Sequence, residues 1–536
     1  MLYLAITVLA TVTLYYELYV AGSVSTLILQ KLNMGFSFFV VTLAIGNLIG
    51  AFGSLLAGLT DRLGRTNLVV VGLLITGIMV VAVIPAQTGK WGFTAASFAV
   101  GLVEGICLVA TPALIRDFSP QTGRATAMGF WTSGPVLGSL IVAVVGSNTV
   151  PNNPKPGFWT HEYYICGVVG LVVFVVALVG LRELSPRLRD QLMVSMQDRV
   201  LIEAKAKGLT EADLEAAMRS PFRQLLKPDV VISALGISIF LLIYYTAVGF
   251  GVIYLTTVFG FSVKDANGIG NWNWGFDLLG LLIFGVVSDK MRVRKPFMVI
   301  GGVASAIMMV VYLEQAGHHT GYYTLAIITG ILAFCLGVAY VPWMASFTES
   351  VEARNPALTA TGLAIWGWII RVVVFVAYLI LPVVINSVNP LVNYGAAVQQ
   401  VVAEYPSQVA TLSVIHPDTL AALKANPKDG AAIGQAVTQI STGLHVTPAK
   451  AVADLIAVSK LPASATATLA HAPAVEKAAK ETPGQWKDWY WICFGCMIFF
   501  VGTVPLMRGR WSPAAAKRDE EAHEAMVQAE LAKLHA

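Results

Sequence analysis

Apolar residues in this chain come in long runs that short polar stretches separate. Twelve runs reach about 20 residues, the length with which a helix crosses about 30 Å of hydrocarbon. Backbone groups in lipid must bond within their own segment, so each run is predicted to be a transmembrane helix. The spans are expected at residues 2–28, 38–59, 67–86, 92–115, 126–146, 163–181, 230–259, 267–288, 296–313, 322–344, 358–385 and 489–506.

Composition agrees with an all-α membrane protein. Of the 536 residues, 56% are hydrophobic and 12% charged, about half the charged fraction of a soluble domain. This excludes an ordinary soluble enzyme, and the net charge of +4 is too small to indicate a nucleic-acid partner. All five cysteines fall inside spans, so even the closely spaced Cys493 and Cys496 are expected to pack rather than to form a redox or metal pair.

Arginine marks one side of the predicted membrane. The loops on that side hold Arg62, Arg65, Arg116, Arg124, Arg292, Arg294 and Arg354, whereas the opposite loops hold lysines and no arginine. By the positive-inside rule the arginine side is cytoplasmic, and both termini are expected there. We therefore expect a multi-pass protein of the plasma membrane, of the bacterial inner-membrane type, with the lipid bilayer as a partner.

Two polar segments divide the chain. We predict an N-terminal six-helix bundle over 1–181, a cytoplasmic connector with amphipathic helices over 182–229, spans 7–11 over 230–385, an extracytoplasmic helical insertion over 386–488, span 12 over 489–506 and a cytoplasmic tail over 507–536. Within the insertion, Pro406, Pro417 and Pro448 are each suited to the first turn of a helix.

The two halves carry the same signals at matching places. The loop after span 2 holds Asp61, Arg62, Gly64 and Arg65, and the loop after span 8 holds Asp289, Lys290, Arg292 and Arg294. Pro112 precedes Arg124 by twelve positions, and Pro342 precedes Arg354 by the same interval. Paired signals of this kind indicate an internal repeat.

The loop after span 2 resembles the signature of the major facilitator superfamily of secondary transporters, and the second copy is similar to the degraded version usual in that family. One departure is that Gly58 stands three residues before Asp61, whereas the family places its glycine four before, where this chain has Ala57. The resemblance implies two pseudo-symmetric six-helix bundles that rock about a central site. We expect a monomer without a cofactor.

The signature loops are predicted to act as a conformational latch. An acidic side chain at a helix end can accept hydrogen bonds from the free amides of a neighbouring helix, and an arginine can pair with a carboxylate across the bundle. The latch residues are expected to be Asp61, Arg62, Gly64, Arg65, Arg124 and Asp289. The arginines also fit the role of setting the orientation of the protein in the membrane.

Four ionisable residues stand near the middle of spans, where a charge is costly and is a functional candidate. Glu17, Glu104 and Asp277 are predicted proton-coupling residues. By resemblance, spans 1 and 4 line the central cavity, so Glu17 and Glu104 are expected to face water. Arg371 stays charged, and it is either an anion ligand or the partner of Asp277 or Glu104.

Aromatic and polar residues near these charges are suited to a small polar ligand. The substrate-binding residues are predicted to be Arg371, Tyr16, Tyr244, Tyr245, Asn273 and Trp366. In span 5, Gly134, Pro135 and Gly138 resemble a motif of exporter subfamilies, and Pro135 is expected to kink the span.

These patterns predict a secondary transporter that moves a small anionic metabolite coupled to protons. The alternatives are a proton-coupled exporter of drugs or amphipathic compounds and a sensor built on a transporter fold. An ATP-driven pump needs a phosphate-binding loop, which the sequence lacks. The histidines lie outside the spans, and neither a metal site nor a catalytic cluster is predicted.

Overall fold

The computed structural model describes residues 2–55, 64–118, 131–182, 225–352 and 359–515, together with the pairs 517–518, 521–522 and 525–526. Every regular element in these ranges is helical, so the predicted all-α fold class is confirmed. The connector helices predicted within 182–229 fall almost wholly outside the described residues.

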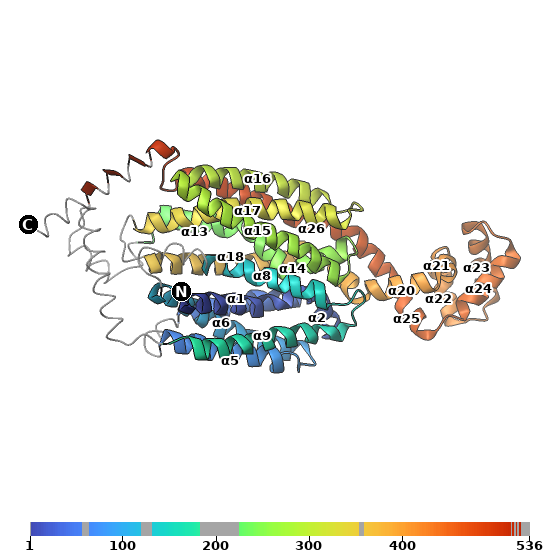
Figure 1. Cartoon of the computed structure of the whole chain (residues 1–536). Coiled ribbons are helices and arrows are strands. Elements are labelled where there is room, and N and C mark those ends of the chain that lie inside the picture. Colours follow the sequence, from blue (N-terminus) through green and yellow to red (C-terminus); the bar gives the residue numbers. More distant parts are fainter. Residues whose placement is uncertain are drawn as a thin grey trace, which may run out of the picture. The chain divides into compact units, whose positions relative to one another are not determined.

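The first half of the chain forms a bundle of long helices that lie side by side (Figure 1). Its elements are α1 (Leu2–Ser23), α2 (Ser25–Lys31), α3 (Phe36–Leu55), α5 (Arg65–Ile78), the π-helical turn η1 (Met79–Val83), α6 (Lys90–Phe118), α8 (Gly134–Thr149), the 3₁₀ turn η3 (Pro156–Phe158) and α9 (Trp159–Gly180). These helices cover the first six predicted spans.

The second half contains the helices of the other six spans. They are α13 (Pro228–Phe240) and α14 (Leu242–Val258), which share one span, then α15 (Val263–Met291), α16 (Lys295–Glu314), α17 (Tyr322–Glu352), α18 (Thr359–Val384) and α26 (Ala472–Thr503), which ends in the 3₁₀ turn η6 (Val504–Leu506). Ten stretches of the described chain are long and apolar enough to cross a membrane. The remaining two predicted spans correspond to the short α8 and to α15, whose first half is rich in asparagine.

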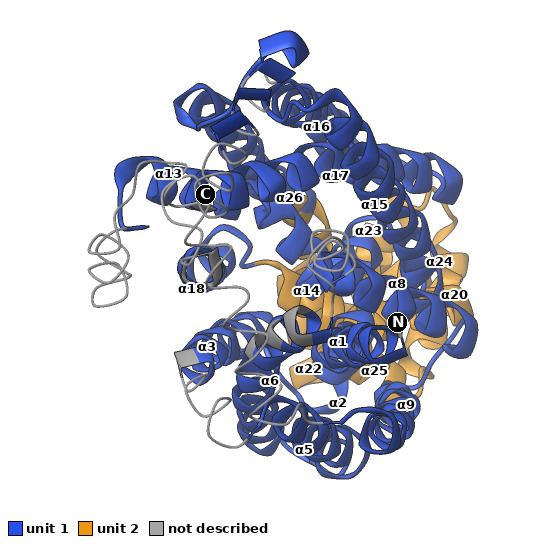
Figure 2. Ribbon diagram, turned by 60° about the vertical axis from the view of Figure 1, so that its left-hand side comes forward, with its two compact units in different colours: residues 1–386, 483–536 blue, residues 387–482 orange. Residues whose placement is uncertain are grey.

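The chain divides into two compact units, one of residues 1–386 and 483–536 and the other of residues 387–482 (Figure 2). The second unit consists of short helices: α19 (Val388–Pro390), the π-helical turn η5 (Leu391–Gly395), α20 (Ala396–Glu404), α21 (Pro406–Ser413), α22 (Pro417–Ala425), α23 (Gly430–Gly443), α24 (Pro448–Ser459) and α25 (Ala463–Leu469). Three of them begin at the prolines from which helices were predicted. Residues of α22, α23 and α24 and of the loops beside them pack around a small core of Ile415, Ile440 and Ala451.

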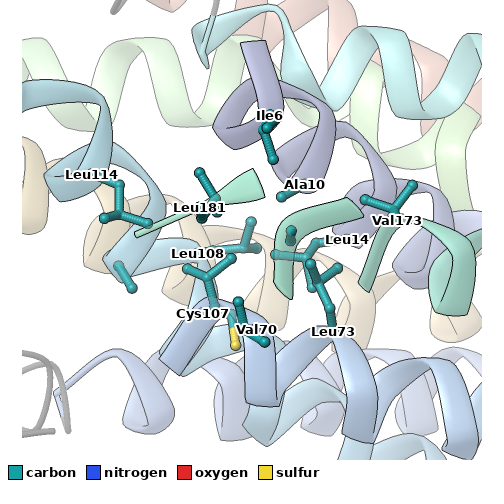
Figure 3. Packing of buried hydrophobic residues seen from close by; sticks show 13 residues of the cluster. Ile6, Ala10, Leu14, Val70, Leu73, Cys107, Leu108, Leu114, Val173 and Leu181 are labelled. Atoms are coloured by element: carbon teal, nitrogen blue, oxygen red, sulfur yellow. The ribbon is translucent and has the colours of Figure 1, made fainter. Parts of the chain in front are cut away.

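An apolar cluster joins four helices of the first half (Figure 3). Leu14 of α1, Leu73 of α5, Leu108 of α6 and Val173 of α9 are among its buried members. Where two helices approach most closely, glycine is required. A Cβ on Gly105 of α6 would lie 2.3 Å from the carbonyl oxygen of Gly50 of α3. Backbones in a lipid-embedded bundle can touch only where side chains are this small.

The two halves meet through pairs of helices that obey a two-fold relation. The third helix of the chain, α3, packs against α18, and α8 packs against α15. In span numbers, span 2 packs against span 11, and span 5 packs against span 8. Spans 8 and 11 are the counterparts of spans 2 and 5 in the second half, so the two contacts are equivalent under the repeat. Spans 1 and 7 also meet, through α1 and α14. The predicted pseudo-symmetric arrangement is thus present in the packing.

Span 5 is interrupted next to Pro135. Residues 131–132 are helical, Ser133 forms a turn, and α8 begins at Gly134 with Pro135 in its first turn. A proline there sacrifices no helical hydrogen bond, because the first amides of a helix have no partner within it. The motif glycine Gly138 serves packing, since a Cβ on it would lie 2.6 Å from the Cβ of Tyr15.

Candidate functional site

The halves are locked together at one end of the bundle, which we call the Ser23 end because α1 ends there. The Asn267 Nδ2 amide of α15 donates to the Ser23 carbonyl oxygen at 3.0 Å, and Asn271 Nδ2 donates to Ser147 Oγ of α8 at 2.9 Å. Gly22 of α1 touches the α14 backbone so closely that an added Cβ would lie 2.1 Å from the Val248 carbonyl oxygen. This end of the seam is closed by direct contact.

Further along the seam, tyrosines from both halves gather around Arg371 of α18. Tyr15 of α1 and Tyr245 of α14 both lie within electrostatic reach of the guanidinium group. The Tyr378 hydroxyl donates to the Tyr245 carbonyl oxygen at 2.8 Å and fixes the backbone there. No hydrogen bond or ion pair joins Arg371 to another residue within the described ranges. The ion pair with Asp277 or Glu104, which was one of the two roles considered for Arg371, is therefore absent from this conformation.

A chain of ring contacts extends this tyrosine cluster. The ring of Tyr244 lies 5.2 Å from that of Tyr245 and 5.2 Å from that of Trp274. The Tyr244 hydroxyl reaches across the seam to Ser139 Oγ at 3.5 Å. Tyr19 of α1 also interacts with Tyr244. Both halves thus contribute hydroxyl groups to one central region.

Glu17 and Glu104 lie inside the first half and do not face a water-filled cavity, contrary to the sequence-based expectation. Their exposed fractions are 3% and 1%, and their carboxylate oxygens have no hydrogen-bond partner of normal geometry among the described residues. Glu17 is packed against the backbone of α9, where a Cβ on Gly170 would collide with its Oε1 atom. The two carboxyl groups are within electrostatic reach of each other. Together they form a buried carboxyl pair.

Two predicted substrate residues, Tyr16 and Trp366, are packed among other side chains of their own halves. Tyr16 is 1% exposed and is directed into the first half, toward Cys166 of α9. Trp366 of α18 packs with its ring 5.4 Å from the ring of Trp343, and its indole nitrogen is buried. The structure places Tyr245 within electrostatic reach of Arg371, whereas Tyr16 is directed into the first half.

Asp277 and Asn273 line a small cavity within the second half. Both residues belong to α15, and Tyr244 of α14 and Thr329 of α17 contribute to the same lining. The Asp277 side chain is 5% exposed and forms no ion pair with another described residue. This carboxyl group therefore stands apart from the buried carboxyl pair of the first half.

One of the predicted latch residues, Asp289, forms an ion pair at the far end of the second half. Arg294 Nη1 lies 2.6 Å from Asp289 Oδ1, and Arg294 Nη2 lies 2.9 Å from Glu349 Oε1 of α17. Burial opposes the charge of Arg294, but Glu349 and Asp289 outweigh it and raise the pKa of the guanidinium group. Neither Arg294 nor Glu349 was among the predicted latch residues.

In the first signature loop, Gly64 is the N-cap residue of α5 and has a φ of 87°, a conformation that favours glycine. Arg65 follows as the first residue of that helix. The predicted latch residues Asp61, Arg62 and Arg124 lie outside the described residues.

The sequence analysis missed Tyr15, Tyr19 and Tyr340 as residues of the central region. Tyr340 of α17 is within electrostatic reach of Tyr245, Tyr15 and Asp277. Tyr15 and Tyr19 had one signal in the sequence, their position in the middle third of span 1, where the hydroxyl of a tyrosine has no water to bond. Tyr340 lies in the last third of span 10 and had no such signal.

Comparisons with known proteins agree with this architecture. The sequence profile of the Major Facilitator Superfamily matches residues 7–378. The chain is 26% identical to the efflux pump radE of Floropilus chiversii, over 47% of this chain and 46% of that protein. It is 27% identical to the multidrug resistance protein MdtL of Shewanella oneidensis, over 28% of this chain and 36% of that protein. The alignments thus span less than half the length of either relative.

Among solved structures, the chain is similar to a bacterial homolog of the human lysosomal transporter Spinster in an inward-facing, unoccupied conformation. The TM-score is 0.55 at 16% identity, with 89% of this chain and 97% of that chain covered. It is also similar to the inward-open xylose transporter XylE from E. coli, with a TM-score of 0.50 at 18% identity and coverage of 70% and 89%. These likenesses show the fold, and with the profile match they establish that the chain is a multi-pass membrane protein that belongs to the Major Facilitator Superfamily.

Proposed function

We propose that this protein is a proton-coupled secondary transporter for a small anionic metabolite. The observation that carries the proposal is Arg371, a permanent cation within a membrane-spanning helix that has no ionic partner among the described residues. Arg371 is only partly buried, and a cation without an ionic partner inside a membrane-spanning helix is costly, a cost that an anionic substrate would offset. Tyr15 and Tyr245, which approach it from opposite halves, can then donate hydrogen bonds to the same anion.

Alternating access follows from the placement of this site on the seam. The hydrogen bonds of Asn267 and Asn271 close the Ser23 end, and substrate would enter from the opposite end. With the orientation expected from the arginine-rich loops, the closed Ser23 end would be the outer end, and substrate would enter from the cytoplasmic side. Release of the two asparagine contacts would open the outer side.

The buried carboxyl pair is the proposed proton site. A buried carboxyl group with no ionic partner is suited to exchange a proton when the halves move and admit water. Glu17 lies on α1, the helix that also carries Tyr15 to the substrate region. A shift of α1 would therefore reach both sites at once, which is how proton and substrate movement would be linked.

The first test is thermal stabilisation of the purified protein by organic acids, amines, sugars and lipophilic cations. A ligand at a hundred times its Kd adds about 2.7 kcal/mol to stability. Stabilisation by acids is expected in the wild type and is expected to disappear in Arg371→Ala. Arg508→Ala is the matched control, because it removes the same charge from an exposed pair with Asp229. Full acid stabilisation of Arg371→Ala would refute the anion site.

The second candidate function is proton-coupled export of amphipathic compounds. Two observations favour it: the efflux names of the partly aligned relatives and the aromatic rings around Tyr244. In the same panel, stabilisation by lipophilic cations alone would support export. Arg371 would then serve the protein fold and not substrate recognition.

A further inference from the structure

The cavity beside Asp277 has chemistry that the transport proposal does not use. It lies entirely within the second half, between α14, α15, α16, α17 and α26. Its volume is about 30 Å³, which suits one small ion or water molecule and is too small for a metabolite. Most of its lining is aliphatic or aromatic, so its few polar groups converge on a space that is otherwise apolar.

Oxygen atoms suited to a hard cation come from two helices. Asp277 and Asn273 are four residues apart on α15, so their side chains lie on the same face of that helix. Neither makes a hydrogen bond to another described residue. Thr329 of α17 faces them, and its hydroxyl hydrogen is already donated to the Leu325 carbonyl oxygen at 2.9 Å. The Thr329 hydroxyl therefore presents lone pairs to the cavity.

We propose that this cavity binds a single sodium ion, with Asp277, Asn273 and Thr329 as its protein ligands. A carboxylate, an amide oxygen and a hydroxyl are the oxygen donors that alkali and alkaline-earth ions take in proteins. One monovalent cation neutralises the one carboxylate, whereas a divalent ion would leave an uncompensated charge in an apolar site. The described residues contain no group of three acidic, histidine or cysteine side chains that could hold a transition metal.

The ion site adjoins the seam between the halves through Tyr244. The Tyr244 ring lines the cavity, while its hydroxyl contacts Ser139 Oγ of α8 at 3.5 Å. A bound ion would hold α15 and α17 in a fixed relation beside the ring of this tyrosine. Sodium would thus be a second coupling ion beside the proton. This inference rests on the proposed function only for the movement of the halves.

The test is direct binding of ²²Na⁺ to the purified full-length protein without substrate, together with melting curves in NaCl and choline chloride at equal ionic strength. Saturable ²²Na⁺ binding and a higher Tm in NaCl are expected for the wild type. Asp277→Asn is expected to lose both. Asp265→Asn is the matched control on the same helix, since Asp265 is exposed and far from the cavity lining, and it is expected to retain both.

If Asp277→Asn fails to fold, Thr329→Val is the second test. Valine has nearly the shape of threonine but lacks the hydroxyl ligand. Loss of a supporting oxygen is expected to weaken sodium binding roughly tenfold. Unchanged sodium affinity in Thr329→Val or Asp277→Asn overturns the proposal, and so does wild-type protein that responds to pH but not to sodium. Sodium binding without acid transport would overturn only the proposed function, whereas acid transport without sodium binding would overturn only this inference.

Discussion

The contact between Gly22 and α14 makes a quantitative prediction for Gly22→Ala. The added Cβ would lie 2.1 Å from the Val248 carbonyl oxygen, a backbone atom that no rotamer change can move away. The halves must therefore separate by about 1 Å at the Ser23 end. The bond from Asn267 to the Ser23 carbonyl oxygen, now 3.0 Å, would lengthen past the hydrogen-bonding range, and the bond from Asn271 to Ser147 would weaken with it.

Each of these two bonds contributes about 1 kcal/mol net. Their combined loss favours the open Ser23 end by about 2 kcal/mol, which is roughly a thirtyfold change in the ratio of the two conformations. Spin labels at Lys31 of α2 and Lys264 of α15 report this change as a distance distribution between the halves. The population at long distance is expected to grow in Gly22→Ala.

Gly275→Ala is the matched control. It places a methyl group on the same kind of helical glycine, but nothing lies within 4 Å of the new Cβ. Its distance distribution should match that of the wild type. If Gly22→Ala also matches the wild type, the backbone contact at the Ser23 end does not hold the halves together, and the account of this seam is wrong.

Three further predictions concern the carboxyl pair and the latch. In proteoliposomes, Glu17→Gln is expected to lose accumulation driven by a pH gradient and to retain counterflow; unchanged accumulation would rule out Glu17 as the proton carrier. Gly170→Ala forces the Glu17 carboxylate out of its place against α9, so it should impair the same accumulation and lower stability by about 1–3 kcal/mol in thermal unfolding. Arg294→Ala is expected to cost about 1 kcal/mol or less, because Asp289 and Glu349 are 69% and 54% exposed; a loss that persists in 1 M salt would contradict this electrostatic origin.

The fold could be predicted from the sequence because lipid imposes simple rules on length. A run of about 20 apolar residues has one stable structure in a bilayer, and repeated loop signals identify the two halves. Helix starts were predictable where proline occupies the first turn, as at Pro406 and Pro417. Pro135 also lies in the first turn of a helix, but it stands inside an apolar run; the sequence predicted an irregularity of the span there, and the turn at Ser133 provides one.

The site was harder to predict because the faces of these helices are not marked. Tyr15 and Tyr16 are adjacent, so they point about 100° apart on α1, one toward Arg371 and the other toward Cys166. A soluble helix would distinguish such faces by polarity, but α1 is apolar all round. For the same reason, the sequence could not show that Glu17 and Glu104 lie inside the first half and not toward the central cavity.

The segment of residues 387–482 interrupts the transporter at one well-defined point. On the flanking chain, the Asn386 backbone amide donates to Gln485 Oε1 at 2.9 Å, and Gln485 Nε2 donates to Asn386 Oδ1 at 2.9 Å. The chain therefore leaves the bundle at Asn386 and rejoins it at Gln485, two residues that hydrogen-bond to each other. An insertion whose ends are already this close can be gained or lost without moving the helices on either side. The segment is thus a removable module, which evolution could add to a complete transporter and which an engineer could replace with a short turn.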